Sequence, residues 1–193
     1  MSATPVSLLE RLRLHPGPAD WRRLVDLYTP LIRNWLCRCD LQESDAEDLS
    51  QEVLGVLVRE LPTFRHDLRT GAFRRWLRTV VVHRVRDFWR ARRRRPSTGS
   101  EGLENVLTQL EDPASGLSQL WDRQHDQHVV RRLLELIRPD FEPATWEAFR
   151  LVQLEGQSTD IVAAQLGLSP NAVRIAKSRV LCRFRQEAAG LLD

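Results

Sequence analysis

The chain has 193 residues, of which 42% are hydrophobic and 28% are charged. This composition is enough to bury a core, and no stretch approaches the roughly 18 consecutive apolar residues of a membrane span. The first residues lack the apolar segment of a secretory signal, so we expect a soluble, cytoplasmic protein. The cysteines Cys37, Cys39 and Cys182 are odd in number and have no framework spacing, which argues against a disulfide scaffold.

The net charge of +3 conceals four alternating blocks. Residues 40–60 are acidic, and residues 64–95 then hold twelve arginines against two aspartates. Residues 101–126 are acidic again, and residues 174–185 are basic. Blocks of opposite sign predict several surfaces that meet partners of different charge.

The first half of the chain shows helical periodicity and no alternating strand pattern. Apolar residues recur at helical spacing over 20–39, 45–61 and 73–94. Ser44 and Glu47 form a capping-box pattern at the start of the second of these helices, and a proline follows its end. With a short loop before the third helix, these stretches predict a compact helical domain within residues 1–95.

The composition changes after this domain. Residues 96–116 are rich in Ser, Thr, Gly, Glu and Pro, which predicts a flexible acidic linker. Periodicity resumes at Leu117, so we expect a second helical domain over 117–193. The predicted fold class is all-α, with two small helical domains joined by the linker and a helix-turn-helix in the C-terminal one.

Residues 145–185 have the organisation of a helix-turn-helix. Gly167 supplies a left-handed turn residue after a short helix whose core candidates include Ile161. Ser169 caps the last helix, and Pro170 occupies its first position, where proline is favoured. A short helix, a glycine turn and a capped second helix are typical of a major-groove reader.

The last helix has an apolar side with Val173, Val180 and Phe184, and a polar, basic outer face. The residues that we expect to contact DNA are Asn171, Arg174, Ile175, Lys177, Ser178, Arg179 and Arg183. Arginine can read guanine edges, and asparagine can read adenine. A solvated helix pair is the alternative, but the spacing and the capping together favour DNA reading.

The stretch 73–94 interleaves arginine with Trp76, Phe88 and Trp89. Arginines supply salt-dependent attraction to phosphates, and exposed aromatic rings can stack on unpaired bases. Most of these rings should lie in the core, with one or two exposed. The stretch therefore predicts a second nucleic-acid surface.

These residues carry a family resemblance. The stretches DAEDLSQEVLGVLVRELPTF (45–64) and FRRWLRTVVVHRVRDFWRARRRR (73–95) resemble the second conserved region of bacterial sigma factors, and TDIVAAQLGLSPNAVRIAKSRVLCRFRQE (159–187) resembles their fourth. Because no other conserved region separates them, the chain resembles the minimal extracytoplasmic-function (ECF) group.

The resemblance implies a promoter-specificity subunit that binds core RNA polymerase, reads the −35 element of promoter DNA with the helix over 170–184 and melts the −10 element. The helix over 45–61 would dock on the clamp coiled coil of the largest polymerase subunit through Asp45, Asp48, Gln51 and Glu52. The residues placed at the −10 element are Arg65, His66, Arg69, Arg74, Arg75, Trp76, Arg78, His83 and Arg86. The linker would run through the RNA exit channel, and the family often has an anti-sigma factor as a further partner.

Two other classes of function stay open on the residues alone. A stand-alone helix-turn-helix repressor or activator without polymerase docking explains residues 145–185 but neither the acidic helix nor the arginine-rich one. For an enzyme, the adjacent His66 and Asp67 are a weak signal, and Cys37 with Cys39 does not complete a zinc site. We therefore expect no catalytic activity, no metal and no cofactor.

Overall fold

The computed structural model describes residues 7–39, 41–64, 71–92 and 100–192. In these ranges the α-helices are α1 (Leu8–Leu14), α2 (Pro18–Leu36), α3 (Glu43–Glu60), α4 (Ala72–Arg92), α5 (Ser100–Glu111), α6 (Gly116–Ile137), α7 (Pro143–Phe149), α8 (Thr159–Leu166) and α9 (Pro170–Ala188). Short 3₁₀ turns and one π-helical turn complete the regular structure of these ranges, and no strand occurs in them, which confirms the all-α prediction. None of the helices within them has the length and apolar character to span a bilayer.

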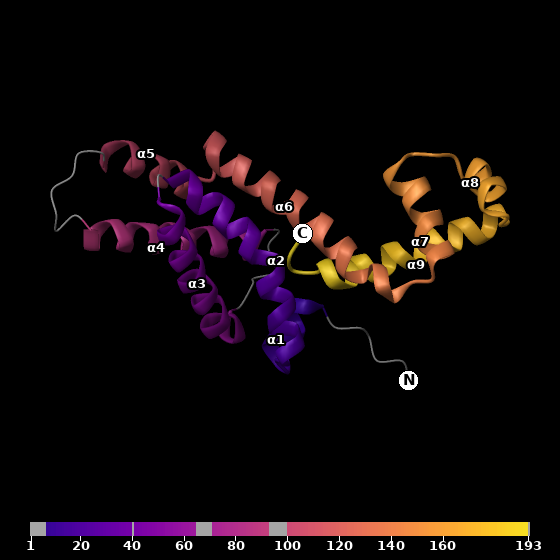
Figure 1. Cartoon of the computed structure of the whole chain (residues 1–193), viewed down its shortest axis with the longest axis horizontal. Coiled ribbons are helices and arrows are strands. Elements are labelled where there is room, and N and C mark those ends of the chain that lie inside the picture. The colour runs from indigo at the N-terminus through magenta and orange to yellow at the C-terminus, as the bar shows by residue number, and fades with distance from the viewer. Residues whose placement is uncertain (1–6, 40, 65–70, 93–99, 193) are drawn as a thin grey trace.

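The molecule is elongated (Figure 1). Helices α2 to α5 gather towards one end, with α1 below the middle of the molecule in this view. Helices α7, α8 and α9 form a lobe at the other end, and α6 runs between the two. Helix α9 leads back from the lobe, so the C-terminus lies near the middle of the molecule, beside α2 and α6 in this view. The lobe is therefore connected to the rest of the chain by two long helices.

The core of the larger end is built from α2, α3 and α4. Tyr28, Trp35 and Phe73 are fully or almost fully buried there, and the Tyr28 and Phe73 rings lie 5.3 Å apart between centroids. Burial of each large apolar side chain contributes about 2 kcal/mol to stability. The periodic apolar positions that predicted these three helices are the ones that fill this core.

The sequence periodicity did not predict α1, whose Leu8, Leu9 and Leu12 are buried in the same core. The Ser7 side chain caps the helix by accepting a hydrogen bond from the Glu10 backbone N–H at 3.3 Å. This serine, followed by two leucines and then by a glutamate three residues on, is a recognisable helix start. A seven-residue helix is too short to give a convincing period on its own.

The predicted capping box of α3 is wrong. The helix begins at Glu43, and its N-cap residue Gln42 makes no side-chain capping hydrogen bond. Ser44 therefore lies inside the first turn. Glu43 and Asp45 place negative charge in that turn, where it interacts favourably with the positive end of the helix dipole and stabilises the helix.

The predicted flexible linker over 96–116 is wrong for residues 100–111, which form α5. Leu107 and Leu110 are buried in the core that contains α2, α3 and α4, and Leu103 packs against it. Leucines at this spacing share one helix face, and their burial outweighs a polar composition that would otherwise favour disorder. The part of the segment that precedes α5 lies outside the described residues.

Helix α6 packs against both ends of the molecule. Trp121 and Val129 are buried in the larger core, and the Trp121 ring centroid lies 4.8 Å from that of Trp35 in α2. Ile137, at the other end of the helix, joins Phe149 and Val180 in a second cluster. The expected second domain, 117–193, thus begins with a helix whose first half packs on the first domain.

The lobe shows the local features that the sequence predicted. Ser169 caps α9 by accepting a hydrogen bond from Ala172 N–H at 3.1 Å, Pro170 begins the helix, and Gly167 has a φ of 65°. Val162 and Val173 are fully buried between α8 and α9. The core assignment of Ile161 is wrong, because its side chain is 60% exposed on the outer side of α8.

Candidate nucleic-acid and protein interfaces

Helix α3 presents an acidic, solvent-facing surface. Asp48, Gln51 and Glu52 are exposed, while Leu49 and Val53 are buried on the inner side of the helix. This division follows from the spacing of three and four residues along the helix. Three of the four residues expected to contact a protein partner therefore share one open face.

The fourth residue, Asp45, is placed differently. Its carboxylate accepts a hydrogen bond from Arg92, at the end of α4, at 2.6 Å. Asp45 thus ties the start of α3 to the end of α4 and is only partly exposed. A side chain held in this way is less free to meet an incoming partner than the neighbouring Asp48.

The residues expected at the −10 element fall into three groups. Arg65, His66 and Arg69 lie outside the described residues. Arg75 and His83 of α4 are exposed. Arg74, Trp76, Arg78 and Arg86 are partly or fully buried. The aromatic member, Trp76, packs with its ring centroid 4.8 Å from that of Phe64, so only part of its surface is open.

Arg74 and Arg78 point into the interface between α4 and α6. Arg74 donates to Asp126 at 2.7 Å, and Arg78 donates to Asp122 at 3.1 Å. Arg78 is 4% exposed, and it also donates to the backbone oxygen of Ser118 at 3.3 Å. Burial lowers the pKa of Arg78 although Asp122 favours its charged form, and the guanidinium keeps its charge at any ordinary pH.

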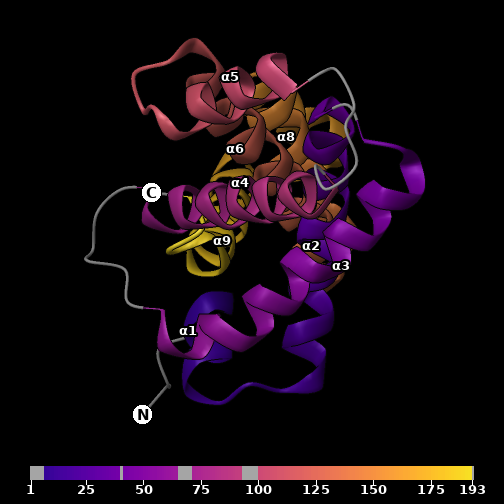
Figure 2. The same ribbon diagram turned by 90° about the vertical axis from the view of Figure 1, so that its left-hand side faces the viewer.

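Arg86, two turns further along α4, is paired with α5. It donates to Glu104 and Glu111, and its closest contact to Glu104 is 3.1 Å. The hydrogen bond to Glu111 is the main reason that the pKa of Arg86 is raised. Three of the arginines predicted to contact DNA therefore face carboxylates of α5 and α6. Figure 2 shows α4 lying across the front of α6, with α5 above it.

A hydrogen-bonded chain that is buried at Tyr28 and His125 joins α2, α6 and α4. The Tyr28 hydroxyl lies 3.2 Å from His125 Nε2, and His125 Nδ1 lies 3.0 Å from Asp126. His125 is fully buried. Burial by itself raises the pKa of Asp126, but the hydrogen bond from His125 and the charge of Arg74 bring it below its usual value. Burial also raises the pKa of Tyr28 well above its usual value.

A second set of contacts between α2 and α6 lies next to Pro30, inside α2. Proline has no N–H, so the Asp26 carbonyl four residues earlier loses its helical donor. Arg132 of α6 donates to that carbonyl at 3.5 Å, and His128 Nε2 bonds to the neighbouring Leu27 carbonyl at 2.6 Å. Helix α6 thus satisfies backbone groups of α2 that lie next to the proline.

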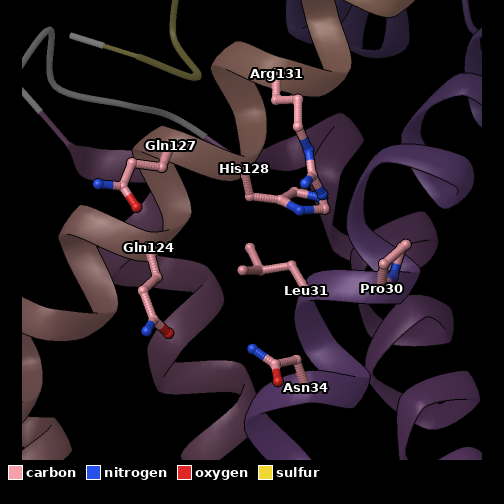
Figure 3. Close-up of a pocket in the computed structure, with 7 residues that line it drawn as sticks. All are labelled: Pro30, Leu31, Asn34, Gln124, Gln127, His128 and Arg131. Carbon is pink, nitrogen blue, oxygen red and sulfur yellow. The ribbon is translucent and has the colours of Figure 1, made fainter.

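An open groove of about 410 Å³ runs beside these contacts. It is lined by Pro30, Leu31, Asn34, Gln124, Gln127, His128 and Arg131. Figure 3 shows the side chains from α6 on one side and those from α2 on the other. The groove is the seam between the two helices, and burial is the main reason that the pKa of His128 on its wall is lowered.

Helix α9 presents the most open of the expected DNA-contacting surfaces. The exposed members of the predicted set are Asn171, Arg174, Ile175, Ser178 and Arg179. Lys177 is partly buried, as expected for a side chain whose stem packs while its amine reaches outwards. Arg183 lies at the inner end and pairs with Asp140 at 3.0 Å and with Glu187 at 2.7 Å.

The end of α9 is fastened to α1. Arg11 contacts Glu187 at 3.2 Å and Asp20 at 2.9 Å, and Glu187 is buried. Leu191, just beyond α9, is buried in the larger core. The sequence carries no signal for this junction, because the paired residues are 176 positions apart.

Within the described residues, no group of His, Cys, Asp and Glu side chains is arranged to hold a metal ion. Cys37 is exposed and Cys39 is buried, with its thiol 3.6 Å from the Trp35 carbonyl oxygen. Burial raises the pKa of Cys39 to about 11, so this thiol stays protonated at neutral pH. The inert, buried character of Cys39 is that of a structural cysteine.

Comparison with known proteins identifies the family. The family model described as sigma-70 region 2 matches residues 24–95. The RNA polymerase sigma-E factor of Streptomyces coelicolor is 30% identical over 143 residues, which cover 74% of this chain and 71% of that protein. The RNA polymerase sigma factor CarQ of Myxococcus xanthus is 27% identical over 175 residues, or 90% and 92% of the two chains.

Two further sequence relatives are also named as sigma factors. The ECF RNA polymerase sigma factor ShbA of Streptomyces griseus is 29% identical over 140 residues, 72% of this chain and 69% of that protein. The chain spans only 35% of a probable sigma factor, RfaY, of Xanthomonas campestris, with 27% identity. A solved structure of a complex between RsbN and BldN aligns over 92% of this chain and 97% of the other at 20% identity, with a TM-score of 0.35. By its sequence relatives, the chain belongs to the ECF group of bacterial RNA polymerase sigma factors.

Proposed function

We propose that this sigma factor binds core RNA polymerase through the exposed face of α3 and directs it to promoters. In this proposal α9 reads the −35 element, and α4 with the loop before it melts the −10 element. The mechanism uses binding energy to separate DNA strands and involves no covalent chemistry. In this proposal residues 1–95 contain the part that binds polymerase and the −10 element, and residues 117–193 contain the part that binds the −35 element.

The acidic face of α3 supports the polymerase contact. Asp48, Gln51 and Glu52 are exposed together on one side of a helix that the core holds rigidly from the other side. Charged groups on a rigid surface speed association with an oppositely charged partner and fix its orientation. We propose the clamp coiled coil of the largest polymerase subunit as that partner.

The outer face of α9 supports the −35 contact. Arg174 and Arg179 can donate paired hydrogen bonds to guanine, and Asn171 can do so to adenine. Ile175 is 44% exposed on the outer face of α9, and it can contact a thymine methyl group. We therefore propose that Ile175 contributes to the choice of promoter.

The stand-alone repressor or activator is the less supported candidate. It gives no role to the exposed acids of α3, whereas the match over residues 24–95 covers most of α2 and all of α3 and α4. An anti-sigma partner stays a prediction from the resemblance.

The experiment that tests the proposal is co-elution of the purified chain with core RNA polymerase of Streptomyces coelicolor on a sizing column. We expect a stoichiometric complex and at least a ~30-fold loss of affinity in Asp48→Arg, because like charges at an interface cost several kcal/mol. Asp26→Arg is the matched control, since it makes the same charge change at an exposed position of α2. Circular dichroism checks that both variants are folded, and an unchanged affinity in Asp48→Arg contradicts the α3 docking.

A further inference from the structure

Helices α5 and α6 lay a row of carboxylates along one side of α4. Asp122 and Asp126 of α6 meet Arg78 and Arg74, as described above. Glu104 and Glu111 of α5 meet Arg86 two turns further on. All four acids come from the acidic block that follows the arginine-rich block in the sequence. The two blocks are therefore paired with each other inside one molecule.

The paired arginines have little surface left for another ligand. The side chains of Arg74, Arg78 and Arg86 are 17%, 5% and 22% exposed. A guanidinium binds carboxylate and phosphate oxygens through the same N–H groups. An arginine that holds a carboxylate in this way cannot hold a DNA phosphate with those donors at the same time.

Both polar and apolar contacts hold α6 in place. They include the buried bond between Tyr28 and His125 and the bond from His128 to the Leu27 carbonyl. Each such hydrogen bond replaces one to water and adds only about 1 kcal/mol to stability. Movement of α5 and α6 away from α4 would also expose Trp121 and Val129 of α6 and Leu107 and Leu110 of α5, which are buried in the larger core. This displacement therefore needs a partner whose binding energy offsets that loss.

We propose that α5 and the first half of α6 are an autoinhibitory cover that competes with single-stranded DNA for the arginines of α4. The inference rests on the proposed role of α4 at the −10 element. In the free chain the carboxylates occupy Arg74, Arg78 and Arg86, so the chain binds DNA weakly through this surface. The surface becomes available when the cover moves away.

The test measures how tightly the full chain binds a fluorescent oligothymidine of about 20 nucleotides, by fluorescence anisotropy, at one fixed ionic strength. The first variant, Glu104→Gln with Glu111→Gln, removes two charges at partly exposed side chains and should fold normally. We expect at least ~5-fold tighter binding, because one freed arginine adds a phosphate contact. A second variant, Asp122→Asn with Asp126→Asn, should give a gain of ~10-fold or more if circular dichroism shows it folded.

The matched control is Glu43→Gln with Glu135→Gln, which makes the same charge change. These glutamates pair with Arg33 and Arg132, which lie outside α4. We expect a change within ~2-fold, the size of a long-range charge effect. Equal gains in the first variant and in the control overturn the proposal, because net charge alone then explains the result.

Adding Arg86→Ala to the first variant identifies the arginine concerned. If the gain comes from the freed guanidinium, the triple variant returns to the affinity of the unmodified chain. A gain that persists without Arg86 overturns the proposal. If no variant binds DNA more tightly and the unmodified chain still co-elutes with core polymerase, the cover is disproved and the sigma function stands. If the unmodified chain does not co-elute with core polymerase, the proposed function itself has failed.

Discussion

Helices α4 and α9 both combine arginine with apolar residues at helical spacing, and the sequence predicts DNA contact for both. In α9 the predicted side chains mostly point away from the lobe into open space. In α4, Arg74, Arg78 and Arg86 turn towards carboxylates of α5 and α6. Composition thus indicates what a surface can bind, whereas packing decides whether that surface is open.

The strongest way to disturb this comparison is to remove the apolar anchor of α6. Trp121→Ala deletes a fully buried ring that packs on Trp35. We expect the free energy of unfolding to fall by about 3–5 kcal/mol, because the cavity costs contacts in addition to the lost burial. Urea denaturation measures the change. Leu154→Ala, at an exposed side chain of the lobe, is the control and should change stability by less than about 0.5 kcal/mol.

Arginine deletion compares the two helices directly. Arg78→Ala removes a buried guanidinium that donates to Asp122 and to the Ser118 carbonyl, and it leaves Asp122 with its longer 3.6 Å contact to Arg74, so we expect a loss of about 2–3 kcal/mol. Arg174→Ala, in the exposed face of α9, should stay within about 0.5 kcal/mol of the unmodified chain. Thermal or urea unfolding of the two variants gives the answer. Equal losses would mean that α4 and α9 are not differently packed.

Ile175→Ala sharpens the comparison on the α9 side. The side chain is exposed, so stability should be unchanged, while affinity of the polymerase complex for its promoter falls by about 5-fold through loss of an apolar contact. Promoter binding by the reconstituted complex measures this. A loss of stability without a loss of DNA affinity would place Ile175 in the fold and remove it from the proposed DNA surface.

Acid titration gives the smallest expected effect. The pKa of Asp126 is lower in the folded chain than in the unfolded chain. Its carboxylate therefore stabilises the fold fully at pH values above the unfolded-state pKa of about 3.9. This stabilisation is lost as the pH falls through the lower pKa of the folded chain. Unfolding free energies of the unmodified chain should therefore fall more steeply below about pH 4 than those of Asp126→Asn. Because Asp126 is partly exposed, the difference should be below about 1 kcal/mol. Parallel curves for the two proteins would contradict it.

The local features of the lobe were predictable because neighbours in the chain determine them. Ser169, Pro170 and Gly167 each act within one helical turn, through a cap, a fixed φ and a left-handed turn. The exposed acids of α3 were predictable for the same reason, since their spacing puts them opposite Leu49 and Val53. Helix α5 was missed because its polar composition suggested disorder, and only docking on the core buries Leu107 and Leu110.

The sequence by itself determined the helical class, the approximate extent of α2, α3 and α4, and the family, and it predicted the residues that we propose to meet polymerase and DNA. Only the tertiary structure decided which charges meet. Arg78 and Asp122 are 44 positions apart, and Arg11 and Glu187 are 176 apart, so no local pattern couples them. Periodicity reports which side of a helix faces a core, because burial is a property of one helix face. A salt bridge depends on where two helices come to rest, and that position follows from the packing of the whole chain.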